Sequence, residues 1–119
     1  PHAVISEEVS IGDGTFIGAG AIIGSNVKLG KNVIVGSGST IEHDSMIGSN
    51  VHIAPGVNID TRVRIKDGAY LGIGCKVIPD ITIGANAVVP AGQVVTQDVK
   101  DTPEADKKYT GETFYNWKK

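Results

Sequence analysis

The sequence predicts an all-β domain in which short strands repeat every six residues. An aliphatic residue occupies every sixth position from Ile5 to Val95, and no insertion interrupts the series. A period of six does not follow one face of an α-helix, and the glycine after the aliphatic residue in eight hexads would cost a helix about 1 kcal/mol each. A fixed short period of this kind is typical of a solenoid. The sixteen aliphatic residues are Ile5, Ile11, Ile17, Ile23, Leu29, Val35, Ile41, Ile47, Ile53, Ile59, Ile65, Leu71, Val77, Ile83, Val89 and Val95.

Each hexad in turn is expected to supply one short strand and one corner. The fifth position is small or β-branched in nearly every hexad, as at Val9, Ala21 and Ser39, and this favours a second inward row. The chain has 16 glycines and few aromatic residues, a composition that suits strands joined by tight corners. We therefore expect a solenoid over residues 1–100.

The last part of the chain leaves the six-residue period. In this part, Thr102 followed by Pro103 and Glu104 is typical of the start of a short helix. A solenoid needs its open ends covered, so residues 101–119 are expected to form a tail that caps the C-terminal coil. Four of the six aromatic residues lie there, at Tyr109, Phe114, Tyr115 and Trp117.

Composition and charge exclude several classes of protein. A net charge of −2 offers no electrostatic basis for binding nucleic acid or an anionic membrane. No apolar run reaches the length of a membrane span. The single Cys75 lies on the inward small-residue row, where a packing role is expected, and one cysteine is consistent with a reducing cytoplasm.

The pattern aliphatic–Gly–x–x–small–x resembles the hexapeptide repeat of the left-handed parallel β-helix over about four fifths of the chain. The resemblance implies a triangular prism with three hexads in each coil and about five coils in all. It also implies that the first residue of each hexad points inward and the last points outward from a flat face. The left-handed crossover follows from the resemblance alone, because parallel strands usually connect with the right-handed sense.

The outward residues then form three columns, one on each face of the prism. One column is mostly polar and another is mixed. The third is apolar apart from one histidine and runs the length of the prism, which is typical of an interface. The resemblance implies a homotrimer, and this face is the expected contact. The third column contains Phe16, Ile34, His52, Tyr70 and Val88.

Two histidines are candidates for a site, but the prism separates them. His43 is third in its hexad and lies at the corner between the mixed and the polar faces, whereas His52 lies on the apolar face opposite. The two can serve one reaction only across a subunit interface. His2 precedes the repeat, and Glu42 is expected to be part of the corner structure.

The segments "IEHD", "NVHIAPGV" and "LGIGCKVIPDITIGANAVVPAGQVV" resemble one subgroup of the hexapeptide-repeat acyltransferases. These bacterial enzymes acetylate sialic acid or nucleotide-linked amino sugars with acetyl-CoA. The resemblance implies that His43 is the general base, that Asp44 orients it, and that His52 lies near the acetyl group. It further implies direct transfer to an amine or hydroxyl, without an acyl-enzyme and without a metal.

Physical chemistry agrees with these roles. An imidazole with a pKa of about 6.5 accepts a proton near neutral pH, and a carboxylate on its other nitrogen fixes the tautomer. The backbone N–H of Thr61, one coil further on, is a candidate donor to the oxyanion, although the subgroup usually has glycine there.

The resemblance places acetyl-CoA along a corner row between subunits. Here the matching row is Pro55, Ile73 and Ala91, with Gly56, Gly72 and Gly74 nearby.

Two departures from the subgroup leave the acceptor open. Its members begin with a nucleotide-binding α/β domain, so either this chain is a fragment or its sugar acceptor is held by something else. The subgroup's "G-x-P-A" ending is replaced by "EADKKYTGETFYNW". Neither the acceptor nor the choice between O- and N-acetylation follows from the sequence.

Other proteins with the same prism need residue patterns that this sequence lacks. A γ-type carbonic anhydrase needs three converging histidine ligands, and the chain has only three histidines, two of them on opposed elements. No face carries the regular threonine row of an ice-binding solenoid. A non-catalytic trimeric scaffold remains the alternative to an acetyltransferase, because the prism and its apolar column would satisfy it.

Overall fold

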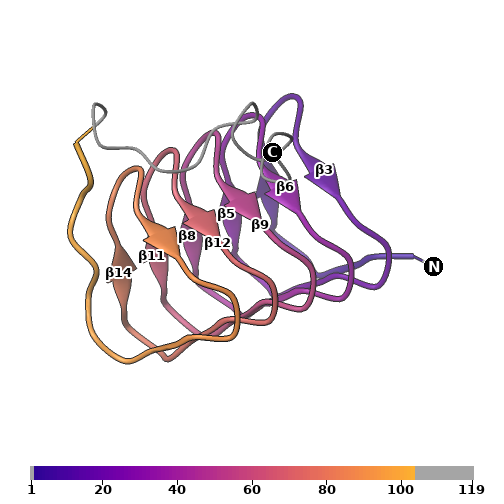
Figure 1. The fold of residues 1–119 in the computed structure, drawn as a ribbon. Coiled ribbons are helices and arrows are strands. Elements are labelled where there is room, and N and C mark those ends of the chain that lie inside the picture. Colours follow the sequence, from indigo (N-terminus) through magenta and orange to yellow (C-terminus); the bar gives the residue numbers. More distant parts are fainter. Residues whose placement is uncertain (1, 104–119) are drawn as a thin grey trace, which may run out of the picture.

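The computed structural model describes residues 2–103, which fold into a three-sided β-solenoid. Every strand has two residues, and paired strands are 18 residues apart, as Val4 and Ile22 are. The coils stack in chain order from the N-terminal end, as the colour sequence in Figure 1 shows. The predicted fold class is confirmed: the described residues are all-β and match a left-handed β-helix of about five coils.

Three parallel sheets form the three faces of the prism. Sheet A consists of β1 (Val4–Ile5), β4 (Ile22–Ile23), β7 (Thr40–Ile41), β10 (Asn58–Ile59), β13 (Lys76–Val77) and β16 (Val94–Val95). Sheet B consists of β2 (Ser10–Ile11), β5 (Lys28–Leu29), β8 (Met46–Ile47), β11 (Arg64–Ile65) and β14 (Thr82–Ile83). Sheet C consists of β3 (Phe16–Ile17), β6 (Ile34–Val35), β9 (His52–Ile53), β12 (Tyr70–Leu71) and β15 (Val88–Val89).

The second residue of each strand is the aliphatic residue of the six-residue period. These residues are buried from Ile23 onward, and Cys75 is buried with them. Ile5 and Ile11 are 46% and 42% exposed, because the first coil has a neighbour on only one side. Burial raises the pKa of the Cys75 thiol to about 11, so the side chain stays protonated and packs as a small apolar group.

The C-terminal end of the described chain continues beside sheet B. Val99 pairs with Ile83, and the Thr102 N–H donates to the Ala85 carbonyl. The predicted short helix starts at Thr102, and all of it from Glu104 onward, together with the aromatic cap, lies outside the described residues. The division into a solenoid and a capping tail stays a prediction.

Candidate active site

His43 lies at the corner between sheets A and B, hereafter the A–B corner, in the turn that follows β7. Asp44 follows it with a φ of 63°, in the left-handed region. The turn rests on Gly24 of the preceding coil, where a Cβ would come within 2.7 Å of the His43 backbone nitrogen. Glycine at that position therefore allows the coil that carries His43 to stack closely on its neighbour.

The side chains of His43 and Asp44 contact each other directly. His43 Nδ1 lies 2.8 Å from Asp44 Oδ2, and the two side chains are 48% and 44% exposed. The hydrogen bond from His43, then that from Asn26, and the charge of Arg62 hold the pKa of Asp44 below its usual value. An ionised carboxylate only accepts, so Nδ1 carries the proton in this contact and the lone pair of a neutral imidazole is on Nε2. That is the arrangement a general base requires.

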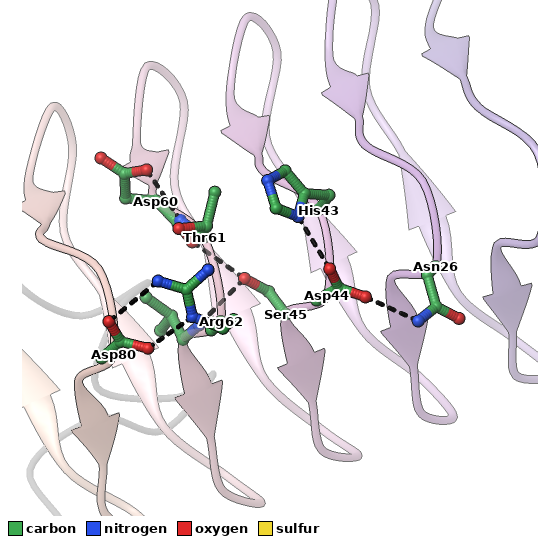
Figure 2. A network of polar contacts seen from close by, with 9 residues as sticks. Asn26, His43, Asp44, Ser45, Asp60, Thr61, Arg62 and Asp80 are labelled. Atoms are coloured by element: carbon green, nitrogen blue, oxygen red, sulfur yellow. Dashed lines mark hydrogen bonds and ion pairs between the residues drawn. The ribbon is translucent and has the colours of Figure 1, made fainter.

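The next coil toward the C-terminus brings Thr61 to the same corner. The buried Ser45 fixes this turn: its Oγ donates to the Asp60 carbonyl at 2.9 Å and accepts from the Val63 N–H at 3.1 Å. The Thr61 N–H donates to Asp60 Oδ1 at 2.8 Å, as Figure 2 shows. This N–H is therefore engaged by a neighbouring exposed carboxylate, which would have to rotate before the N–H could serve a ligand.

His52 lies in β9 on sheet C, across the prism from the A–B corner. Its ring meets that of Tyr70 edge to face, with centroids 5.1 Å apart. Sheet C places the five residues of the apolar column on consecutive strands, as the six-residue period predicts. One chain therefore does not bring His43 and His52 together.

The pH dependence of stability should report on His52. Burial lowers the pKa of His52 below its ordinary 6.5, so the unfolded chain binds this proton more readily. The free energy of unfolding should fall as the pH drops through and below about 6.5. Urea unfolding at pH 7 and pH 5 is expected to show a smaller loss in His52→Asn than in the wild type. Equal losses would show that His52 does not carry this dependence.

The predicted cofactor row lies at the corner between sheets C and A, hereafter the C–A corner. Pro55, Gly56 and Ala91 are exposed, and Ile73 is 61% exposed, so the row presents both backbone and an apolar side chain. Gly72 is buried, and a Cβ there would come within 2.6 Å of the Ala91 nitrogen. Packing between coils therefore accounts for Gly72 without any ligand.

The C–A corner also differs from the A–B corner in a way the sequence reasoning missed. Each turn places one residue in the left-handed region, and at the A–B corner these residues all carry side chains, from Glu8 to Asp80. At the C–A corner the same position is glycine in all five coils, which leaves the backbone uncovered along the prism. The five residues are Gly20, Gly38, Gly56, Gly74 and Gly92.

A groove of about 360 Å³ runs along sheet A beside the A–B corner. Glu42 and Asp60, which flank the turns of His43 and Thr61, lie on its wall, and Lys76 and Val94 also line it. The sequence alone predicts only a corner-structure role for Glu42. Its position on the groove wall depends on the stacking of β7, β10 and β13, which no local motif signals.

Within residues 2–103, no three His, Cys, Asp or Glu side chains are grouped as a metal ion would require. Over the same residues, no helix has the length and hydropathy to cross a membrane.

Comparison with known proteins gives two family-model matches. A model of the bacterial transferase hexapeptide (six repeats) matches residues 8–43 and 26–61, and a model of the hexapeptide repeat of succinyl-transferase matches residues 62–97. No curated protein matches the chain.

Solved structures resemble the chain over most of its length. PerB from Caulobacter crescentus, in complex with CoA and GDP-perosamine, is 36% identical with a TM-score of 0.84 over 86% of this chain and 49% of that chain. The acetyltransferase domain of PglB from Neisseria gonorrhoeae FA1090, in complex with acetyl coenzyme A, is 31% identical with a TM-score of 0.83 over 85% and 49%. WeeI from Acinetobacter baumannii AYE is 36% identical with a TM-score of 0.80 over 83% and 49%.

The chain thus spans about half the length of the structures it matches. The repeat models follow the same six-residue period that places every strand of the solenoid. The chain belongs to the hexapeptide-repeat family of bacterial transferases.

Proposed function

We propose that this domain is an acetyl-CoA-dependent acetyltransferase that acts on an amine or hydroxyl of a sugar or sugar nucleotide. The observation that carries the proposal is the contact of His43 Nδ1 with Asp44 Oδ2, at the exposed A–B corner. The matched structures support it, since PerB was solved with CoA and GDP-perosamine and the PglB domain with acetyl coenzyme A. Two other matched structures are variants of the perosamine N-acetyltransferase in which one histidine is replaced.

His43 is the proposed general base. Acetyl-CoA supplies a thioester, whose carbonyl carbon is attacked by the amine or hydroxyl of the acceptor. Nε2 of His43 accepts the proton that the attacking group loses, and Asp44 stabilises the imidazolium that forms. When the carbon–sulfur bond breaks, the imidazolium gives this proton to the departing thiolate sulfur, which leaves as the free thiol of CoA. The base is thereby regenerated without an acyl-enzyme.

The complete site is proposed to form between subunits of a homotrimer. Sheet C, with the apolar column Phe16, Ile34, His52, Tyr70 and Val88, is the proposed contact face. Across this contact, the C–A corner of one subunit approaches the A–B corner of the next. Acetyl-CoA would lie along the glycine column, where bare backbone permits close approach, and Ile73 would pack against it.

Two groups are proposed to act on the acetyl carbonyl. The Thr61 N–H would donate to the oxyanion once Asp60 turns away from it. His52, on the neighbouring subunit, would lie near the acetyl group. The sheet A groove beside Glu42 and Asp60 is the proposed acceptor site, because it is the groove that adjoins the turn of His43.

The reaction is proposed to occur in the cytoplasm, since a single buried free cysteine suits a reducing compartment.

An acceptor screen tests the proposed function. The purified chain is incubated with acetyl-CoA and a panel of amino sugars and nucleotide-linked sugars, and thiol release and the acetylated product are measured. We expect acceptor-dependent thiol release, and after an acid quench no acetyl group on the protein.

Three results would contradict this account in different ways. Acetylated protein after the quench would replace direct transfer with a covalent mechanism. Transfer that is equally fast in His43→Ala would remove the assigned base. A folded trimer that transfers acetyl to none of the acceptors would favour the non-catalytic scaffold.

A further inference from the structure

The A–B corner carries a column of stacked polar side chains that continues on both sides of Asp44. Asn26, Asp44, Arg62 and Asp80 occupy equivalent positions in four consecutive coils, and each has a φ between 55° and 68°. Equivalent backbone geometry sends these side chains in the same direction, so each lies beside the next along the prism, as Figure 2 shows. Side chains at this position therefore meet partners 18 residues away in the sequence.

Asn26 contacts the oxygen of Asp44 that His43 does not use. Asn26 Nδ2 donates to Asp44 Oδ1 at 2.6 Å, while His43 holds Oδ2 at 2.8 Å. An exposed aspartate has several accessible rotamers, and a single contact to a neighbouring residue does not select one. Two contacts, one on each oxygen, fix the plane of the carboxylate against the imidazole.

Arg62 lies between two carboxylates in the column, one coil from each. It contacts Asp80 through two hydrogen bonds, Nε to Oδ1 at 2.7 Å and Nη2 to Oδ2 at 3.1 Å. Among the described residues, no ion pair joins Arg62 to Asp44. Adjacent coils are about 4.8 Å apart, so without Asp80 the guanidinium could turn to Asp44 and compete for the oxygen that His43 uses.

We propose that Asn26 and Asp80 are positioning residues for His43: Asn26 orients the Asp44 carboxylate, and Asp80 holds Arg62 away from it. This inference rests on the proposed function, in which Asp44 orients the base. Both residues would act through Asp44, and neither would touch a substrate.

The proposed role of Asn26 is tested with a second asparagine, Asn32, as a matched control. Asn32 has a φ of 57° in the same coil at the corner between sheets B and C, and its side chain is not part of the Asp44 column. Asn26→Ala is expected to lower kcat about two- to fivefold, the scale of an exposed polar contact, with an unchanged Kd for acetyl-CoA. Asn32→Ala should leave kcat unchanged. Equal effects of the two substitutions would overturn this role.

The Asp80 half is tested by a double substitution. Asp80→Ala is expected to lower kcat roughly fivefold, because Arg62 is released toward Asp44. Adding Arg62→Gln should restore most of the activity, as should 1 M salt, which shortens the screening length to about 3 Å. A purely structural role would make the double variant no better than the single one, and that result would overturn the proposal.

A spectroscopic measurement separates this inference from the proposed function. The hydrogen-bonded Nδ1 proton of His43 should be visible by NMR in the wild type, lost in Asp80→Ala and regained in the double variant. If these changes occur in a protein that transfers no acetyl group, they would support the positioning roles and contradict only the proposed acetyltransferase activity. An unchanged Nδ1 signal in Asp80→Ala would overturn the positioning role of Asp80, whatever the activity.

Discussion

His43→Ala is expected to lower kcat for acetyl transfer by about 10²–10⁴-fold, the usual contribution of a positioned general base. The loss should appear in kcat, with the Kd for acetyl-CoA nearly unchanged, because the proposed cofactor row lies at the C–A corner of another subunit. Stability should change little, since the side chain is half exposed and its main partner is the exposed Asp44. Initial rates at saturating acetyl-CoA and a thermal melt of the same sample check both statements.

His2 is the matched control for this substitution. It is exposed and precedes the first strand, so His2→Ala should transfer acetyl at the wild-type rate. A loss of less than about fivefold in His43→Ala, with His2→Ala unchanged, would contradict the role of His43 as base.

Ile59→Ala is expected to lower the free energy of unfolding by about 2–5 kcal/mol, the largest effect on stability among these predictions. Ile59 is fully buried in β10, and its strand pairs with β7 on one side and β13 on the other. Truncation leaves a cavity in the middle of the solenoid, and the backbone ladder on both sides restricts how far the coils can collapse into it. Urea unfolding at a fixed protein concentration measures the change.

Ile22 supplies the control on the same sheet. It occupies the outward position of β4 and is 47% exposed, so Ile22→Ala should change the free energy of unfolding by about 0.5 kcal/mol or less. Equal losses in the two variants would contradict the assignment of alternate residues to the core and the surface.

The fold could be predicted from the sequence because one short period determines it. Residues at a spacing of six, such as Ile41, Ile47 and Ile53, occupy the inward position of consecutive strands. The same count assigns His43 to a corner and His52 to the opposite face. A solenoid repeats one local geometry, so the position of a hexad that fits the pattern poorly can be assigned from the hexads on either side of it.

The contacts within the candidate site could not be predicted in the same way. Asn26 meets Asp44 because both adopt the left-handed conformation at one corner, and nothing near Asp44 in the sequence indicates a partner 18 residues earlier. The engagement of the Thr61 N–H by Asp60 depends on a side-chain rotamer, which no pattern encodes. The all-glycine column at the C–A corner could have been found by comparing the three corners position by position.

The central claim is that acetyl-CoA binds between subunits, at the C–A corner that faces His43 of the neighbouring subunit, and calorimetry on the purified chain tests it most directly. The oligomeric state is determined by sedimentation in the same sample. We predict saturable binding of one acetyl-CoA per chain to a trimer, with binding weakened by Ile73→Asp at the glycine column. Saturable binding to a monomer, or no binding to a folded trimer, would contradict the account.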